Sequence, residues 1–119
     1  MLSISPAVRI FVHAVPTDMR KHFDGLSAIV THAFGKDVLR GDYFVFLNRS
    51  CDRCKILFWD RDGLVVWAKR LERGRFQRPG VADAASLAIE IDSVTLAMML
   101  GGVDLQSVKR RKRYQVAVP

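Results

Sequence analysis

Five short segments of the chain are rich in β-branched and aromatic residues, the composition typical of β-strands. The middle three are apolar at consecutive positions, so both faces of each would be apolar. Turn-forming residues such as Gly, Asp and Pro separate several of the segments. The pattern predicts a sheet of four to five strands, at Val8–His13, Tyr43–Leu47, Lys55–Trp59, Leu64–Leu71 and Leu87–Ile91.

The connections between the middle three segments are short and polar. Residues 60–63, Asp-Arg-Asp-Gly, are typical of a hairpin in which Gly63 takes a positive φ. Strands joined this tightly pair antiparallel, because a parallel pair needs a crossover of about a dozen residues. We therefore expect an antiparallel sheet. Two helices would hardly cover two apolar faces, so the pattern also favours a homo-oligomer.

Helical periodicity follows the first strand. Thr17 is typical of an N-cap, Asp18 would lie in the first turn, and Gly35 is placed to end the helix. A shorter apolar helix is predicted at 93–100, after a capping Asp92. The apolar stripe of the first helix consists of Met19, Phe23, Leu26, Val30 and Ala33. Together the elements predict an α+β domain with one long N-terminal helix and one short C-terminal helix.

The chain has 119 residues, half of them hydrophobic and 26% charged, which is the composition of a globular domain. We expect one domain at 1–105, followed by a basic tail at 106–119. No apolar run reaches the roughly 20 residues of a membrane-spanning helix, and the first residues do not resemble a signal peptide. The sequence therefore predicts a cytoplasmic protein without a membrane partner, whose cysteines stay reduced.

Positive charge is unevenly distributed along the chain. The net charge is +7, yet residues 49–78 contain nine Lys or Arg against four acids, and 109–113 contain five basic residues in succession. Segregated positive charge attracts polyanions, above all nucleic acid. Phe76 could stack on an exposed base. The alternatives are a solvated strand end neutralised by Glu72 and a solubilising tail. The candidate nucleic-acid-binding residues are Arg49, Arg53, Lys55, Lys69, Arg70, Arg73, Arg75, Phe76, Arg78, Lys109, Arg110, Arg111, Lys112 and Arg113.

Catalytic and metal-binding patterns are weak in this sequence. Cys51 and Cys54 have the spacing of half a zinc site, but no second cysteine pair completes it, so we interpret them as a chance pair in a turn. Two acidic pairs could hold a catalytic metal, but a helix N-terminus and a turn explain them better. These pairs are Asp18 with Asp24 and Asp60 with Asp62. We expect no catalytic residues, no metal and no cofactor, and hence no enzyme.

Residues 17–26, Thr-Asp-Met-Arg-Lys-His-Phe-Asp-Gly-Leu, resemble a signature of the TnpB-type accessory protein, the second open reading frame of insertion-sequence family sixty-six. The resemblance extends from about Val8 to Pro79. His22 departs from the family, which usually has Gly there, and Arg78 replaces a usual Trp. The further matching positions are Phe44-Val-Phe46, Arg49, Asp52-Arg53, Lys55, Leu57, Trp59-Asp60, Asp62-Gly-Leu64, Lys69-Arg-Leu-Glu-Arg-Gly-Arg-Phe76 and Pro79.

The resemblance implies an accessory role in transposition beside a separate, larger transposase that carries the catalytic acids. Together with the charge pattern it predicts a non-catalytic factor that binds DNA at the element ends, or the transposase–DNA complex, through a basic surface. The alternative is a module that binds the transposase without contacting DNA, motivated by the apolar strands with Trp59 and Trp67. A metal-dependent nuclease would cleave element DNA, and we expect no cleavage.

Overall fold

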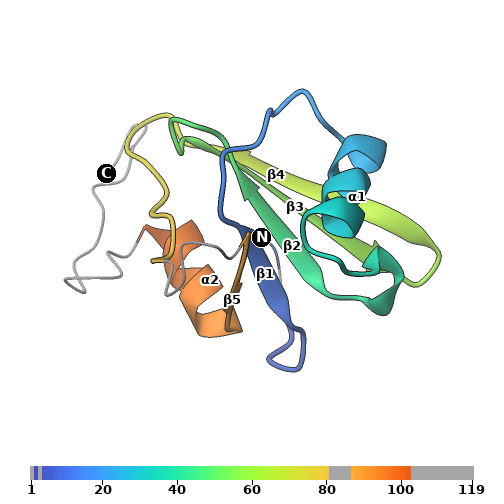
Figure 1. Ribbon diagram of the computed structural model, residues 1–119. Coiled ribbons are helices and arrows are strands. Elements are labelled where there is room, and N and C mark those ends of the chain that lie inside the picture. The colour runs from blue at the N-terminus through green and yellow to red at the C-terminus, as the bar shows by residue number, and fades with distance from the viewer. Residues whose placement is uncertain (1, 3, 81–86, 103–119) are drawn as a thin grey trace.

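The computed structural model describes residues 2, 4–80 and 87–102. Its elements are strands and helices (Figure 1), and the predicted strand segments are all present as strands. In chain order the elements are β1 (Ile10–His13), α1 (Phe23–His32), the 3-10 helix η1 (Val38–Arg40), β2 (Tyr43–Leu47), β3 (Arg53–Asp60), β4 (Gly63–Arg70), β5 (Ala88–Ile91) and α2 (Ser93–Gly101). No helix within these described residues has the length and apolar character needed to cross a membrane.

The five strands form one sheet in the order β4-β3-β2-β1-β5. The prediction of a purely antiparallel sheet is wrong, because β1 and β2 pair parallel while the other pairs are antiparallel. The segment between β1 and β2 contains α1 and η1, and this crossover returns the chain to the end of the sheet where β1 began. The tightly connected strands β2, β3 and β4 do pair antiparallel, as their short connections predict.

The turn between β3 and β4 differs from the prediction in one detail. Asp60 pairs with Gly63, so the connecting residues are Arg61 and Asp62. The residue in the left-handed region is Arg61, with φ 55°, and Gly63 is not among the residues with positive φ. The turn therefore imposes its backbone strain on an arginine.

The first helix is shorter than its apolar stripe predicts, and Thr17 is not its N-cap. It begins at Phe23. Thr17 is 5% exposed, its backbone N–H donates to the carbonyl of Leu47, and its hydroxyl lies 3.2 Å from Nδ1 of His13. The carbonyls of residues 19 and 21 accept hydrogen bonds from Lys55, so they are committed to β3. Tertiary contacts thus replace the first helical turn.

The helix ends follow the sequence more closely. The α1 helix ends at His32, and Gly35 takes a left-handed conformation with φ +62° just beyond it. The predicted cap of α2 is confirmed, since the Asp92 carboxylate accepts a hydrogen bond of 2.7 Å from the backbone N–H of Thr95. At the other end of α2, Gly102 has φ 85°, the left-handed C-cap that glycine favours.

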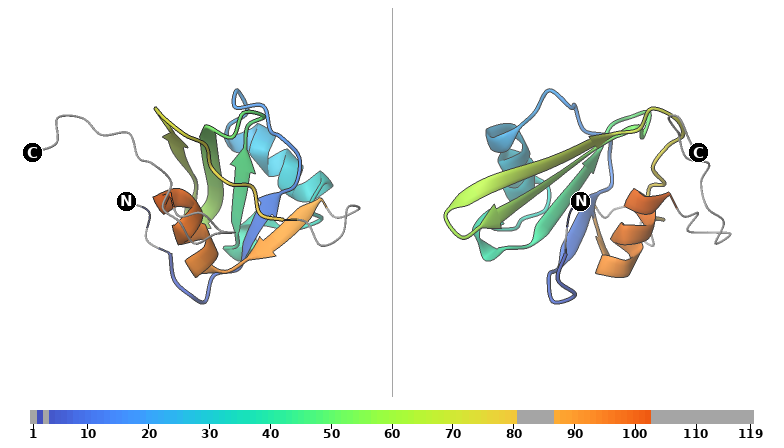
Figure 2. Two further views of the ribbon diagram at one scale, coloured as in Figure 1. Left: turned by 90° about the vertical axis from the view of Figure 1, so that its left-hand side faces the viewer. Right: turned by 180° about the vertical axis from the view of Figure 1, so that it is seen from behind.

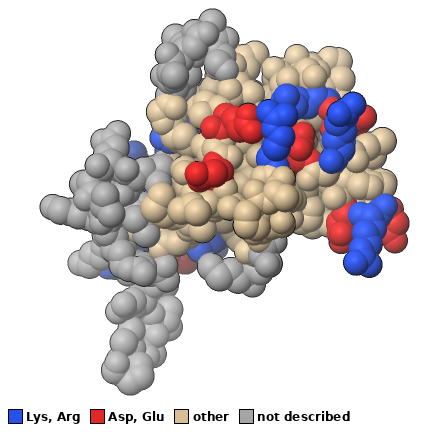
Figure 3. Space-filling model, turned by 90° about the horizontal axis from the view of Figure 1, so that it is seen from below, with Lys and Arg blue, Asp and Glu red and all other residues tan. Residues whose placement is uncertain are grey.

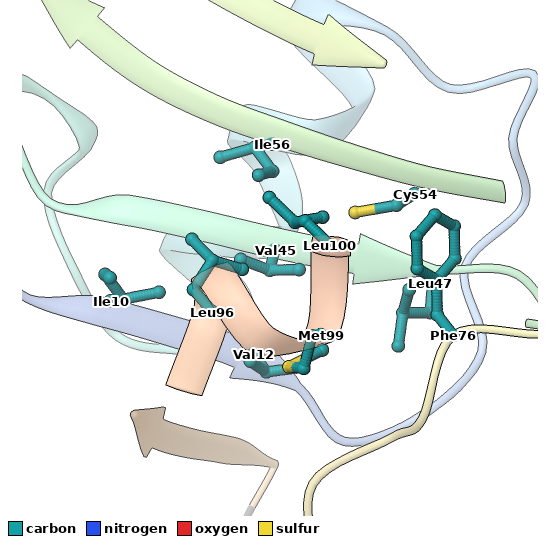
Figure 4. Packing of buried hydrophobic residues seen from close by; sticks show 10 residues of the cluster. All are labelled: Ile10, Val12, Val45, Leu47, Cys54, Ile56, Phe76, Leu96, Met99 and Leu100. Atoms are coloured by element: carbon teal, nitrogen blue, oxygen red, sulfur yellow. The ribbon is translucent and has the colours of Figure 1, made fainter. Parts of the chain in front are cut away.

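The two helices cover opposite faces of the sheet (Figure 2, left). On the face with α1, the buried residues are Phe11, Met19, Leu26, Val30, Phe44, Phe46 and Leu57. On the face with α2 they are Ile10, Val12, Val45, Leu47, Cys54, Ile56, Phe76, Leu96, Met99 and Leu100 (Figure 4). The expectation that two helices leave an apolar face uncovered is therefore wrong for the central strands β1 and β2. The apolar character of these strands therefore no longer supports a homo-oligomer.

Candidate nucleic-acid interface

Three loops meet at one end of the sheet, where β1, β2 and β4 finish and β3 begins (Figure 1). They are residues 14–22, 48–52 and 71–80. The first loop is joined to the sheet by Lys55 of β3, and the third is joined to the second by backbone hydrogen bonds. We call this region the basic end, because the candidate residues of the described chain lie on these loops and on the adjoining strand ends.

The 48–52 turn is built around the side chain of Asn48. Its Oδ1 accepts hydrogen bonds from the backbone N–H groups of Asp52 and Arg53, and its Nδ2 donates to the Asp52 carboxylate at 2.6 Å. These bonds favour the charged carboxylate, and the Asn48 contact is the main reason that the pKa of Asp52 is lowered. Cys51 takes a positive φ of 55°. Held in this way, the turn exposes the side chain of Arg49.

The segment after β4 folds back onto this turn. The backbone N–H of Leu71 donates to the Asp52 carbonyl at 2.7 Å, and that of Phe76 donates to the Cys51 carbonyl at 2.6 Å. Two exposed arginines, Arg73 and Arg75, lie between these contacts. The hydrogen bonds therefore bring arginines from two separate hairpins to the same end of the protein.

Phe76 does not contribute to this surface. Its side chain is 2% exposed and packs in the core cluster on the α2 face of the sheet, beside Leu47 and Cys54 (Figure 4). A ring buried to this extent cannot stack on a base unless the core opens, so the predicted stacking role is wrong for the folded protein. Phe76 instead anchors the arginine-bearing segment to the core.

Arg53 and Arg70 lie where β3 begins and β4 ends, at the basic end. They are direct cross-strand partners at the ends of β3 and β4, and both are exposed. The Nε of Arg70 lies 3.0 Å from a carboxylate oxygen of Glu72, with both side chains at least half exposed. Next to them is a pocket of about 210 Å³ lined by Met19, Arg53, Cys54, Lys55, Ala68, Lys69 and Arg70.

Three of the predicted site residues instead donate to the protein's own carbonyls. Lys55 is 9% exposed, and its Nζ donates to the carbonyls of residues 19 and 21 at 2.8 and 2.7 Å. Burial, followed by the charge of Arg53, lowers the pKa of Lys55. Lys69 donates to the Leu100 carbonyl in the last turn of α2, and Arg78 donates to the carbonyls of residues 13 and 48. These contacts hold loops and a helix against the sheet.

Arg20 and Lys21 join the basic end, although charge counting along the sequence did not select them. Both are exposed, and the Lys55 ammonium binds the Lys21 carbonyl, which places this loop beside β3. Arg20 forms a 2.7 Å ion pair with Asp18, and its hydrogen bonds lower the pKa of that carboxyl to about 2. The sequence signal was the Arg-Lys pair inside the 17–26 motif, but it lies far from 49–78 along the chain.

The opposite end of the sheet carries mixed charges (Figure 3). Arg9 and Glu90 form a two-pronged ion pair there, with both contacts at 2.9 Å. A shallow pocket of about 720 Å³ at this end is lined by Arg9, Thr31, Gly35, Lys36, Asp37, Arg40 and Asp42. Because its acids offset its bases, this end attracts a polyanion less than the basic end does.

The cysteines differ in their surroundings. Cys54 is 1% exposed, and burial raises the pKa of its thiol to about 12, whereas Cys51 is partly exposed. Within residues 2, 4–80 and 87–102, no group of three or more His, Cys, Asp or Glu side chains could hold a metal ion. The predicted tail residues Lys109–Arg113 lie outside the described residues.

Comparison with known proteins identifies relatives along nearly the whole chain. A family model described as IS66 Orf2 like protein matches residues 8–110. The uncharacterized protein y4jC of Sinorhizobium fredii (strain NBRC 101917 / NGR234) is 35% identical over 111 residues, 93% of this chain and 92% of its own. The uncharacterized protein y4hO of the same strain is 36% identical over 104 residues, 87% of this chain and 88% of its own. No solved structure matches the chain.

Proposed function

The chain belongs to the IS66 Orf2-like family, and we therefore propose that it is a non-catalytic accessory protein that binds DNA at the ends of its insertion sequence. Membership of the family implies a role in insertion-sequence transposition. The separate transposase would perform the chemistry. The basic end of the accessory protein would bind the backbone of the element DNA, alone or in the transposase–DNA complex.

The observation that carries this proposal is the convergence of exposed arginines on one end of the sheet. Arg53 and Arg70 are cross-strand partners, and the hydrogen-bonded loops add Arg49, Arg73 and Arg75. Guanidinium groups bind phosphates through paired N–H donors, and such contacts supply most of the affinity of backbone-directed DNA binding. Binding of about five phosphates predicts a slope near −4 to −5 when log K is plotted against log salt.

A salt titration with two matched variants tests the proposal. The test variant is Arg53→Gln with Arg70→Gln, and the control is Arg40→Gln with Arg61→Asn, which removes the same charge from the opposite end. Asparagine is chosen at 61 because it tolerates the positive φ. Fluorescence anisotropy with element-end and unrelated duplexes would measure affinity. We expect the test variant to flatten the slope by about two units and the control to leave it unchanged.

Three outcomes would refute the proposal: no DNA binding at low salt, DNA binding that does not depend on salt, or an equal loss of DNA affinity in the test and control variants.

The alternative, a module that binds the transposase without contacting DNA, is tested by co-purification with the transposase after nuclease treatment and at high salt. Its motivating observation was the apolar strands, but α1 and α2 cover the central sheet, and Trp67 packs partly against the core. If the natural chain binds no duplex and its complex with the transposase persists in the Arg53/Arg70 variant, the alternative is correct.

A further inference from the structure

The pocket at the basic end is lined by four basic residues and by Met19, from the loop before α1. Two of the basic residues come from β3 and two from β4: Arg53, Lys55, Lys69 and Arg70. The pocket volume of about 210 Å³ exceeds that of a single phosphate group, whose share of space is on the order of a few water volumes of about 30 Å³ each. The pocket can therefore admit a phosphate together with ordered water.

The arginines of the pocket repel each other in the absence of an anion. Like charges directly opposite on neighbouring strands destabilise a sheet, and Arg53 and Arg70 occupy such positions. Glu72 contacts Nε of Arg70, while Arg53 has no ion-pair partner in the part of the chain that the structure describes. Lys55 also lines the pocket, and its ammonium is held in place by two backbone carbonyls. An anion between the arginines would replace repulsion by attraction.

We propose that this pocket is a phosphate-binding site that holds one backbone phosphate of the element DNA between Arg53 and Arg70. The inference deepens the proposed function and rests on it for the source of the phosphate. Arg70 and Arg53 supply paired N–H donors, which match the oxygens of a phosphate. The buried Lys55 adds charge from behind without leaving its carbonyl partners. One phosphate bound in a fixed position would set the register of the protein on the duplex, a task that loosely placed surface charges perform poorly.

Inorganic phosphate, compared with chloride at equal ionic strength, is the probe for the site itself. In NMR spectra of the full chain, we expect phosphate to shift the side-chain Nε–Hε resonances of Arg53 and Arg70. The Nε–Hε resonance of Arg40 should not move. Phosphate at ten times its Kd should raise the folding equilibrium constant about elevenfold. Arg53→Gln should remove this stabilisation. In chloride the same variant should be at least as stable as the natural chain, because a cross-strand repulsion is gone.

Competition separates the two sources of phosphate. In the natural chain, inorganic phosphate should weaken duplex binding more than chloride does at equal ionic strength, and Arg53→Gln should abolish the difference. If the duplex binds with the expected salt slope but phosphate neither shifts the two arginines nor competes, the pocket is not the site and the proposed function stands. If phosphate binds in the pocket and no duplex binds, the proposed function fails and a backbone phosphate is not its occupant. If the Arg53→Gln variant binds phosphate as tightly as the natural chain, phosphate acts only by general screening of charge and the proposed site is wrong.

Discussion

Replacement of Lys55 by methionine tests whether this residue stabilises the fold through its two carbonyl contacts. The sequence assigns this residue to DNA binding, whereas in the fold its ammonium is directed at two backbone carbonyls of the loop before α1. Methionine keeps most of the side-chain volume and removes the donor, so no large cavity forms. The variant therefore measures the value of the contact between β3 and that loop.

The expected cost follows from the geometry. Hydrogen bonds to charged groups contribute about 1.5–3 kcal/mol each, and a buried carbonyl left without a donor costs about 1–3 kcal/mol. The Met19 carbonyl is buried, while the bond to the Lys21 carbonyl is only partly buried, so water can replace the second donor. Relief of the desolvation that lowers the pKa of Lys55 offsets part of the loss. We expect Lys55→Met to reduce the free energy of unfolding by about 2–3 kcal/mol.

Urea unfolding followed by tryptophan fluorescence would measure this change. Arg53→Met is the matched control, because Arg53 lies two positions earlier on the same face of β3 and is exposed. Its effect should stay within about 0.5 kcal/mol. A Lys55→Met variant as stable as the control would show that the two carbonyl contacts contribute nothing measurable to the free energy of unfolding.

Three further predictions concern groups near the basic end. Burial, and then the charge of Arg78, lowers the pKa of His13 below its ordinary 6.5. Between 6.5 and that lowered pKa the unfolded chain binds more protons than the folded chain, so the free energy of unfolding should fall as the pH drops through this range. In His13→Asn that decline should vanish in urea titrations; a persistent slope would assign it elsewhere. Cys54 should react with a thiol reagent only after unfolding, whereas Cys51 reacts in the native protein; native labelling at both would contradict the burial. Phe76→Ala should cost about 3–5 kcal/mol, and the milder Phe76→Leu should keep its duplex affinity, which a stacking role would forbid.

Local sequence signals predicted the elements well where the chemistry is local. Residues 43–47 and 64–68 are consecutive apolar runs within β2 and β4. The second helix lies between Asp92 and Gly102, whose capping roles depend on neighbouring residues alone. The start of the first helix was predicted wrongly for the opposite reason. Thr17 has the side chain of a good N-cap, but contacts with His13 and Leu47, distant in sequence or on another element, outweigh that preference.

In the candidate site, too, local sequence signals predicted some features and tertiary contacts decided the others. Counting charges correctly located a basic segment, because electrostatic excess is a property of composition. It could not tell which arginines and lysines face solvent. Lys55 and Arg78 are adjacent to carbonyls only in the folded chain, and Phe76 is buried in a cluster whose other members come from distant strands and from α2. The addition of Arg20 likewise depends on the loop that folding brings to β3.

By itself the sequence determined the strands, the caps of the second helix, the family resemblance and the concentration of positive charge. Each of these depends on residues close together in the chain or on their number. The tertiary structure alone decided the parallel pairing of β1 with β2, the covering of both sheet faces and the placement of Arg53 opposite Arg70. These features arise from the α1 crossover and from hydrogen bonds between distant segments, which no local pattern specifies.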